Sequence, residues 1–301
     1  MPLLRALQGL AFEAMGHRIR TLTGSRGSLE DFALPAGDPG WFGPQAINWR
    51  VHAHFTGMLV GGLSSLMVQA LHPRALAAVW DHSDFRHDLR GRLGRTAYFV
   101  AATTYGAQAM AERTIDRVNQ IHAHVQGTDL QGRPYRANEP ELIRWVHLTE
   151  VSAFARAYQH LARPALRADE LDRYVAEMAQ IGHRLGAQDL PQTWDAHERA
   201  LAPYVPELVH DARSREIVQL IMHYPTEPLD QPFMALVLAA AFDIMPPWAL
   251  DRLERRPACA ARQQATRLAL QLASAPVQAM LDQQGVAATA RRRAQALATP
   301  A

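Results

Sequence analysis

The sequence predicts an all-α protein that folds as a single globular multi-helix domain. Apolar residues recur at spacings of three and four through most of the chain rather than alternating, which is the pattern of amphipathic helices. The hydrophobic fraction of 48% is enough for a buried core in a chain of 301 residues. No internal repeat or change of composition marks a second folding unit in the main body of the chain.

Segments rich in turn-forming residues divide the chain into three parts. Gly, Pro and Asp are frequent before residue 45, so residues 1–44 are expected to form a peripheral helical arm followed by a loop. Residues 45–285 are expected to form the main helical domain, and the Ala- and Arg-rich residues 286–301 a flexible tail. Helical patterns are predicted over residues 49–72, 74–82, 95–126, 139–162, 169–185, 193–201, 212–223, 230–243 and 259–272.

The longest uncharged segment, residues 55–71, is predicted to be a buried core helix. A helix needs roughly 20 apolar residues to cross a bilayer. The segment is shorter than that and is interrupted by polar and small residues such as Gly61, Ser64 and Gln69. A membrane span is therefore the less favoured alternative.

A turn-rich connection joins the predicted helices over residues 95–126 and 139–162. Residues 127–135 carry Gly at both ends of a short polar stretch and are predicted to form a small loop or a short hairpin. Because this connection is short, the two helices are expected to pack antiparallel and to bring their inward faces to one pocket.

Charge and motifs exclude several classes of function. The formal net charge of +2 is spread without a long run of one sign, so the sequence indicates no nucleic-acid partner. Every basic residue is Arg, which excludes a lysine Schiff base and leaves guanidinium groups, suited to binding carboxylates or propionates. The chain has no motif for dinucleotide binding, phosphoryl transfer, zincin chemistry or α/β-hydrolase chemistry.

The single cysteine, Cys259, excludes a disulfide partner within the chain and a thiolate cluster. A reducing cytoplasm is the compartment that such cysteine usage favours. Residues 1–16 lack the order of basic, apolar and small residues typical of a signal peptide. The protein is therefore expected to be cytoplasmic, with peripheral attachment to a membrane as the alternative.

His122 is a candidate metal ligand. Ile115, Val118 and Val125 share a helical face with it, so His122 falls in the middle of an apolar stripe, whereas His124 points elsewhere. A buried imidazole either finds a hydrogen-bond partner or binds a metal through a neutral ring nitrogen. Most buried histidines are simply hydrogen-bonded, and the stripe alone favours that interpretation.

His147 presents the same choice in the next helix. It lies in a stripe with Ile143, Val151, Phe154 and Tyr158. Together with His122 it could ligate one haem, or one histidine could ligate the iron while the other acts on the distal side. The alternative is a structural role in which His147 packs beside Trp145.

A run of Asp and His residues precedes these helices. Its members are Asp81, His82, Asp84, His87 and Asp88. The run could supply metal ligands. Its spacing matches no hydrolase metal site, so a polar helix end followed by a loop is the favoured interpretation.

Arg92, Arg95 and Thr96 form a compact polar group in the segment that follows. Arg92 and Thr96 are four residues apart and share one helical face, while Arg95 stands beside Thr96. A guanidinium and a hydroxyl are thus expected to point into whatever this helix covers.

An ordered series of short motifs gives the chain a resemblance to a known family. The motifs are Leu66-Met-Val-Gln-Ala-Leu-His-Pro-Arg74, Asp81-His-Ser83, Gly91-Arg-Leu-Gly-Arg-Thr96, His122-Ala-His-Val-Gln-Gly127, Gly132-Arg-Pro-Tyr-Arg-Ala137 and Trp145-Val-His147. The sequence resembles the domain shared by ER-bound oxygenases of mycophenolic acid biosynthesis, the latex-clearing rubber oxygenases and many bacterial proteins.

The resemblance implies a helical domain that holds haem b, with His122 as the proximal iron ligand and Arg92 and Thr96 nearby. Rubber oxygenases have a lysine just before the threonine that reaches toward the distal side of the iron, where this chain has Arg95. They also lack the Trp-Val-His motif, which favours His122 over His147 as the ligand.

The resemblance further implies an oxidoreductase that uses O₂ and a haem iron to oxidise a small apolar or lipid-like molecule. Rubber cleavage is an extracellular task, which does not suit a chain expected in the cytoplasm. Arg92, Arg95, Thr96 and His147 are the residues expected to act in catalysis. The alternative function is a haem-binding sensor or a helical interaction protein without turnover.

Overall fold

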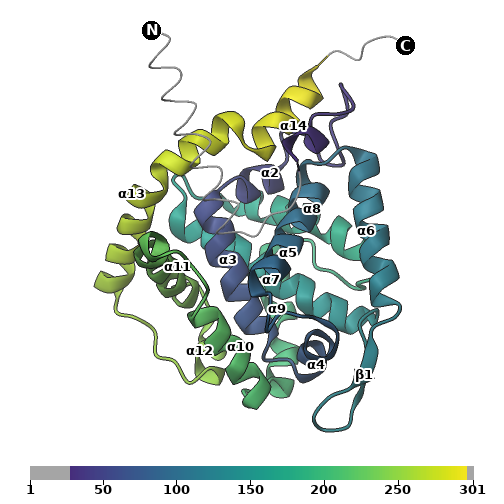
Figure 1. Cartoon of the computed structure of the whole chain (residues 1–301), viewed down its shortest axis with the longest axis vertical. Helices are drawn as coiled ribbons and strands as arrows, with labels where there is room; N and C mark the ends of the chain where they lie inside the picture. The colour runs from purple at the N-terminus through teal and green to yellow at the C-terminus, as the bar shows by residue number, and fades with distance from the viewer. Residues whose placement is uncertain (1–27, 297–301) are drawn as a thin grey trace.

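Helix α3 (Phe55–Gln69) forms the centre of the fold (Figure 1). The computed structural model describes residues 28–296. Buried residues lie on every side of α3, and a helix of this kind is stable only when its neighbours cover all of its faces. Its principal neighbour is α7 (Pro140–Leu161). The remaining faces are covered by α2 (Ile47–His52), α10 (Ala212–Met222), α11 (Gln231–Asp243) and α13 (Ala260–Gln284).

Small residues allow α3 and α7 to approach closely. A Cβ atom added at Gly61 would lie 2.7 Å from Cδ1 of Phe154 and 3.0 Å from the carbonyl oxygen of Ala153. Gly62, the next residue, would place a Cβ in nearly open space, 4.0 Å from Cε1 of Phe154. The contact between the two helices therefore depends on the absence of a side chain at Gly61.

The predicted helix over residues 49–72 is two helices, because the chain turns between α2 and α3. His54 at the turn has an extended backbone, and its Nδ1 accepts a hydrogen bond from the amide of Gly57. The side chain of Gln278 in α13 donates to the carbonyl of Ala53 and accepts from the amide of Phe55. A residue more than 200 positions away thus satisfies the backbone groups that the break exposes.

The predicted helix over residues 95–126 is also two helices, α5 (Leu89–Tyr105) and α6 (Gln108–His122). α5 begins earlier than predicted because the Asp88 carboxylate caps it through the amide of Gly91. The break falls at Gly106, whose backbone is extended. The Asp38 carboxylate accepts the amide of Gln108 and so starts α6.

The connection after α6 is a short hairpin, as predicted. Strand β1 (Gln126–Thr128) pairs antiparallel with β2 (Pro134–Arg136), and Asp129 accepts hydrogen bonds from the amides of Gln131 and Arg133 in the turn. The hairpin extends from one end of the molecule beside α4 (Pro73–His82) (Figure 1).

The two helices that carry the histidines are more separated than the sequence predicts. α6 packs mainly on α5, whereas α7 packs on α3 and on α8 (Ala168–Arg184). The hairpin connects α6, at one edge of the molecule, to α7, at its centre. The inward faces of α6 and α7 consequently border a cavity instead of closing on each other.

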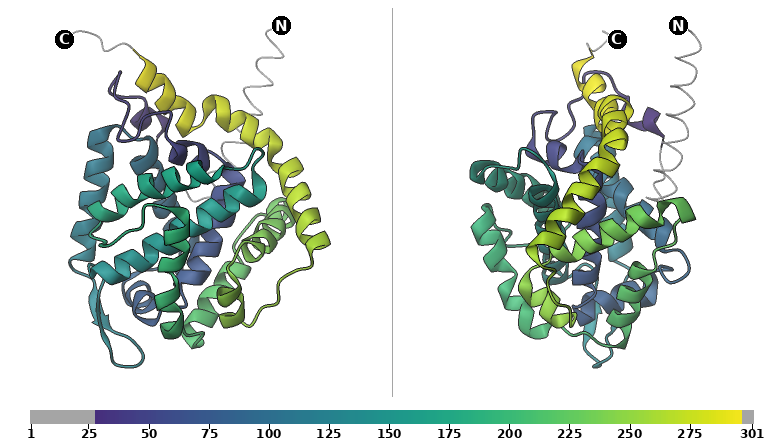
Figure 2. Two further views of the ribbon diagram at one scale, coloured as in Figure 1. Left: turned by 180° about the vertical axis from the view of Figure 1, so that it is seen from behind. Right: turned by 90° about the vertical axis from the view of Figure 1, so that its left-hand side faces the viewer.

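The C-terminal segment differs from the prediction of a flexible tail. α13 continues to Gln284, and α14 (Val286–Gln295) follows along one side of the molecule (Figure 2). Arg293 in α14 is only 2% exposed and donates to the carbonyls of Asp38 and Phe32. These distant carbonyls hold α14 in place, a contact that the local composition could not reveal.

The predicted N-terminal arm lies mostly outside the described residues. Within residues 28–44 the chain forms the short 3₁₀ helix η1 (Leu29–Phe32) and a loop. The other elements are α9 (Trp194–Ala200), η2 (Ala202–Glu207), η3 (Pro228–Asp230) and α12 (Pro247–Arg252). Residues 28–296 thus form an all-α domain with one small hairpin, which confirms the predicted fold class.

No single helix among residues 28–296 is long and apolar enough to cross a membrane. Only α3 and α4 taken together reach the required length and hydropathy, and they are bent by 105° relative to each other.

Candidate functional site

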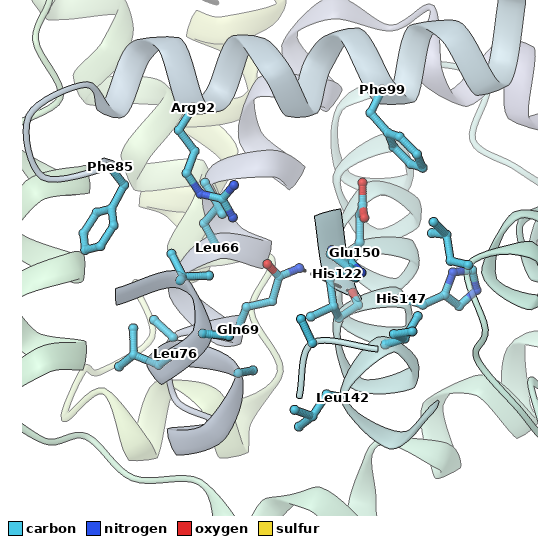
Figure 3. Close-up of a pocket in the computed structure, with 18 of the residues that line it drawn as sticks. Leu66, Gln69, Leu76, Phe85, Arg92, Phe99, His122, Leu142, His147 and Glu150 are labelled. Carbon is cyan, nitrogen blue, oxygen red and sulfur yellow. Dashed lines mark hydrogen bonds between the residues drawn. The ribbon is translucent and has the colours of Figure 1, made fainter. Parts of the chain in front are cut away.

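An apolar cavity lies between the helices that carry the predicted site residues (Figure 3). Its volume is about 220 Å³. Typical small-molecule pockets measure roughly 300–1000 Å³, so this cavity lies just below that range. Its walls are mainly Leu, Ile, Val, Ala and Phe side chains. The polar residues among them are Gln69, Arg92, Thr103, His122, His147 and Glu150.

His122 is the last residue of α6 and its ring borders the cavity. Nδ1 is buried without a hydrogen-bond partner, and neither ring nitrogen bonds to another described residue. Burial, with a smaller contribution from the charge of Arg92, lowers the pKa of His122. The imidazole is therefore neutral near pH 7, which is the form that binds metals.

Arg92 extends from α5 into the same cavity (Figure 3). Its guanidinium makes no hydrogen bond or ion pair with any residue of the described chain. Burial, and then the neighbouring Arg95, lower the pKa of this guanidinium, which nevertheless stays protonated near neutral pH. A cation without a counterion at an apolar cavity is well placed to bind an anionic group.

Thr96 lies one turn after Arg92 on α5, and its hydroxyl contacts the carbonyl oxygen of Arg92 at 3.4 Å. It borders a second cavity, which adjoins the first and is also lined by Arg92. The predicted common face of Arg92 and Thr96 is therefore present: both residues border the second cavity, and only Arg92 also borders the first.

Arg95 does not point into either cavity. Its side chain is 51% exposed and its guanidinium lies 3.8 Å from the Asp88 carboxylate, in a surface groove between α5 and α6. The sequence placed it beside Thr96, but successive residues on a helix point about 100° apart. This geometry corrects the expectation that Arg95 acts at the site.

His147 borders the first cavity from α7, against α8. A Cβ added at Gly182 of α8 would lie 2.8 Å from Nδ1 of His147. Figure 3 places the His147 ring at the side of the cavity away from Arg92. Burial, followed by the proximity of His197 and His183, lowers the pKa of His147 to about 3, and its ring makes no hydrogen bond to a described residue.

Three polar residues of the cavity were not predicted from the sequence: Glu150, Gln69 and Thr103, whose hydroxyl donates to the carbonyl of Phe99 in its own helix. Glu150 follows His147 by one turn and has no hydrogen bond or ion pair within residues 28–296. Burial raises the pKa of its carboxyl to about 7. Gln69, at the end of α3, donates weakly to the carbonyl of Val146 at 3.4 Å. The sequence feature that could have indicated an inward-facing Glu150 is its helical position between His147 and Phe154, on the same apolar stripe.

The acidic run before α5 is a polar helix end, as the favoured interpretation held. Asp81 accepts a hydrogen bond from the hydroxyl of Tyr135, His87 bonds to Asp84, and Asp88 caps α5. No group of three or more His, Cys, Asp or Glu residues in the described part of the chain is arranged to hold a metal ion.

The comparison with known families identifies the fold around this cavity. A model of the catalytic domain of the ER-bound oxygenases mpaB/B′ and the rubber oxygenases matches residues 49–275. The chain belongs to this family. The match confirms the resemblance seen in the motifs and covers about three quarters of the chain. No curated protein and no solved structure matches.

In this member of the oxygenase family, all residues that line the first cavity lie within the matched segment. Family membership supports an oxygenase activity, with O₂ and a second substrate as the reactants. The site is thus part of the catalytic domain and not of a lineage-specific addition.

The residues of the cavity fit a haem. A haem iron requires only one or two protein ligands, because the porphyrin supplies the rest. The neutral, unpartnered ring of His122 would be a suitable iron ligand, and the apolar walls suit the macrocycle. The unpaired guanidinium of Arg92 is a suitable counterion for a propionate.

Proposed function

We propose that this protein is a haem b-dependent oxygenase that oxidises a small apolar molecule with O₂. The observation that supports it most is the buried, unpartnered Nδ1 of His122 at the wall of an apolar cavity, within an oxygenase catalytic domain. Leaving a buried imidazole nitrogen without a hydrogen-bond partner costs about 1–3 kcal/mol. A metal ion bound to the ring would offset this cost and would fix the orientation and the tautomer of the ring.

Each polar residue of the cavity has a separate role in this proposal. His122 would hold the iron and Arg92 would neutralise a propionate, while the hydroxyl of Thr96 contacts the backbone carbonyl of Arg92 from the next turn. When bound, the haem supplies the redox chemistry with O₂. His147 stays neutral near pH 7 and presents an imidazole N–H that can donate a hydrogen bond at the cavity edge.

The apolar lining defines what else the cavity accepts. Side chains from α3, α4, α5, α7, α8 and α10 surround the space with aliphatic and aromatic groups. Such walls exclude water and favour an apolar substrate. We therefore propose a lipid-like small molecule as the class of substrate.

The absorption spectrum of the purified protein, expressed with haem supplementation, tests the proposal. We expect a Soret band in the wild type and its loss in His122→Ala. His124→Ala is the matched control, because His124 lies two residues away on the exposed side and bonds to the carbonyl of Gln120. A folded wild type without a Soret band, or equal haem content in His122→Ala, would contradict the proposal.

Reaction with O₂ separates an oxygenase from a haem-binding protein without turnover. We expect the spectrum of the reduced protein to change rapidly on exposure to O₂, because the proposed activity requires the bound haem to react with O₂. A spectrum that is stable in air would instead indicate a binding or sensing protein.

A further inference from the structure

A second cavity adjoins the His122 cavity and shares part of its lining. It is bordered by α3, α5, α7 and α11, and its volume is about 210 Å³. Its wall consists mostly of apolar residues such as Met58, Leu59 and Leu63. The residues that line both cavities are Leu66, Gln69, Arg92, Val100, Val146 and Glu150.

Gln69 and Glu150 are the neutral polar residues among those that line both cavities. Glu150 has no partner among residues 28–296, and burial raises the pKa of its carboxyl to about 7, so much of it carries an O–H donor near neutral pH. The amide oxygen of Gln69 accepts no hydrogen bond from a described residue, while its nitrogen donates to Val146.

A plain hydrocarbon lying against these groups would keep water away from them and leave them without a hydrogen-bond partner. Burying a polar group without a hydrogen bond is unfavourable, whereas an oxygen atom of the ligand would provide the missing partner. The shared lining therefore discriminates against a pure hydrocarbon and favours a molecule with an oxygen at one end of an apolar chain.

We propose that the second cavity binds the alkyl chain of an aliphatic alcohol, whose hydroxyl lies between Gln69 and Glu150 and faces the His122 cavity. This inference names the substrate class of the proposed oxygenase, and it rests on that function only for the assignment of the reaction to the first cavity. Glu150 is a specificity-determining residue in this arrangement.

Gly62 sets the length of chain that the second cavity accepts. It lines this cavity alone, and a Cβ atom at this position would meet no atom closer than 4.0 Å. A larger side chain at Gly62 would consequently extend into the cavity without pressing on the backbone of α7. The space that it removes is the space for the end of the alkyl chain.

Binding of volatile ligands, measured by headspace gas chromatography over solutions of the purified protein, tests the role of Glu150. The probes are hexan-1-ol and n-hexane. We expect Glu150→Leu to shift the ratio of the two dissociation constants by roughly tenfold in favour of hexane, because the hydroxyl loses its partner. Glu150→Gln, which keeps a donor and an acceptor, should change the ratio by less than about twofold. An unchanged ratio in Glu150→Leu would overturn the inference.

Gln69→Leu provides a second variant in case Glu150→Leu fails to fold, as judged by circular dichroism. It should shift the same ratio in the same direction. A folded Gln69→Leu protein with the ratio of the wild type would overturn the placement of the hydroxyl.

A chain-length series tests the role of Gly62. In Gly62→Leu we expect the dissociation constant of octan-1-ol to rise roughly tenfold and that of butan-1-ol to change by less than about twofold. Ala78→Leu is the matched control, because Ala78 lines only the first cavity; it should leave octan-1-ol binding unchanged. Equal effects on both alcohols in Gly62→Leu would overturn the assignment of the chain to this cavity.

Measuring alcohol binding by His122→Ala, together with its absorption spectrum, separates this inference from the proposed function. Loss of the Soret band with unchanged alcohol binding would support both proposals. An absence of haem from the wild type would contradict the oxygenase proposal alone, since the alcohol measurements do not depend on the spectrum.

Discussion

Several residues at the cavity have buried polar groups for which the described residues provide no hydrogen-bond or ion-pair partner. Arg92 is the strongest case, because its cation is largely buried and unpaired within residues 28–296. Replacing a buried unpaired charge by an apolar side chain removes a desolvation cost. Arg92→Met should therefore raise the free energy of unfolding of the haem-free protein and lower haem affinity roughly tenfold through loss of a charge-assisted contact.

Urea unfolding of the haem-free protein and titration with haem measure these two effects. Arg95→Met is the control, because Arg95 is exposed and outside the cavity, and it should change neither quantity. If Arg92→Met destabilises the fold and keeps full haem affinity, then Arg92 is a structural residue and not a propionate partner.

His147 allows the distal and structural roles to be separated by one substitution. Its ring is buried and makes no hydrogen bond to a described residue, so His147→Leu removes no protein contact of that kind. We expect the free energy of unfolding to stay equal or to rise, haem content to remain, and substrate oxidation to slow. A loss of about 1–3 kcal/mol of stability with an unchanged oxidation rate would assign His147 a structural role instead.

The sequence could predict His122 and Arg92 as site residues, but not Glu150 or the position of Arg95. Motif resemblance pointed to the first two. A glutamate in a helix is usually exposed, and only the burial of α7 against α3 turns Glu150 toward the cavities. The exposure of Arg95 follows from its direction on α5, about 100° around the helix from Thr96.

At the scale of secondary-structure elements, the spacing of α3 and α7 sets the width of both cavities. Gly61 and Gly62 provide a matched pair to test this. Gly61→Ala should lower the free energy of unfolding by about 1–3 kcal/mol, because its methyl group overlaps Phe154 and the backbone of Ala153. Gly62→Ala should raise it by about 0.5–1 kcal/mol, because alanine favours the helix and meets no neighbour closer than 4.0 Å. Urea unfolding measures both, and equal effects would contradict the close approach.

Helix positions were predictable from the period of apolar residues, whereas helix ends were not. The breaks between α2 and α3 and between α5 and α6 depend on Gln278 and Asp38, which are far away in the sequence. The same holds for α14, which Arg293 fixes to the loop after η1. Local patterns contain no information on such partners.

At the scale of the whole molecule, the single helical domain was evident from the sequence, but its cavities were not. The expectation that the His122 and His147 helices pack together assumed that helices joined by a short connection are also neighbours in space. α7 is more apolar and lies at the centre, while α6 lies at the edge on α5. That difference in burial opens the space in which the site lies.

The fold as a whole should lose stability in mild acid, because it buries several neutral histidines outside the proposed iron site. Burial lowers the pKa of His52 to about 3, and burial is also the main cause that lowers those of His72 and His197 to about 4. In the unfolded chain these groups titrate near 6.5. Below that pH the unfolded state binds more protons than the folded state, so the free energy of unfolding falls from pH 6.5 toward pH 4. Burial raises the pKa of Glu150 to about 7, so this residue acts in the opposite sense. It lowers the free energy of unfolding as the pH rises from 4.5 to 7, which offsets the effect of one histidine.

Urea unfolding at several pH values between 4 and 7 measures this dependence, and His52→Gln isolates one histidine. Both ring nitrogens of His52 are hydrogen-bonded, to the hydroxyls of Thr104 and Tyr174, and the amide of glutamine offers a donor and an acceptor of similar reach without titrating. Between pH 6 and pH 4 the free energy of unfolding of the variant should depend on pH less steeply than that of the wild type, by up to about 1.4 kcal/mol per pH unit, which corresponds to one proton. Parallel pH profiles for the two proteins would show that His52 titrates alike in the folded and unfolded states, against the burial that its hydrogen bonds and its 7% exposure indicate.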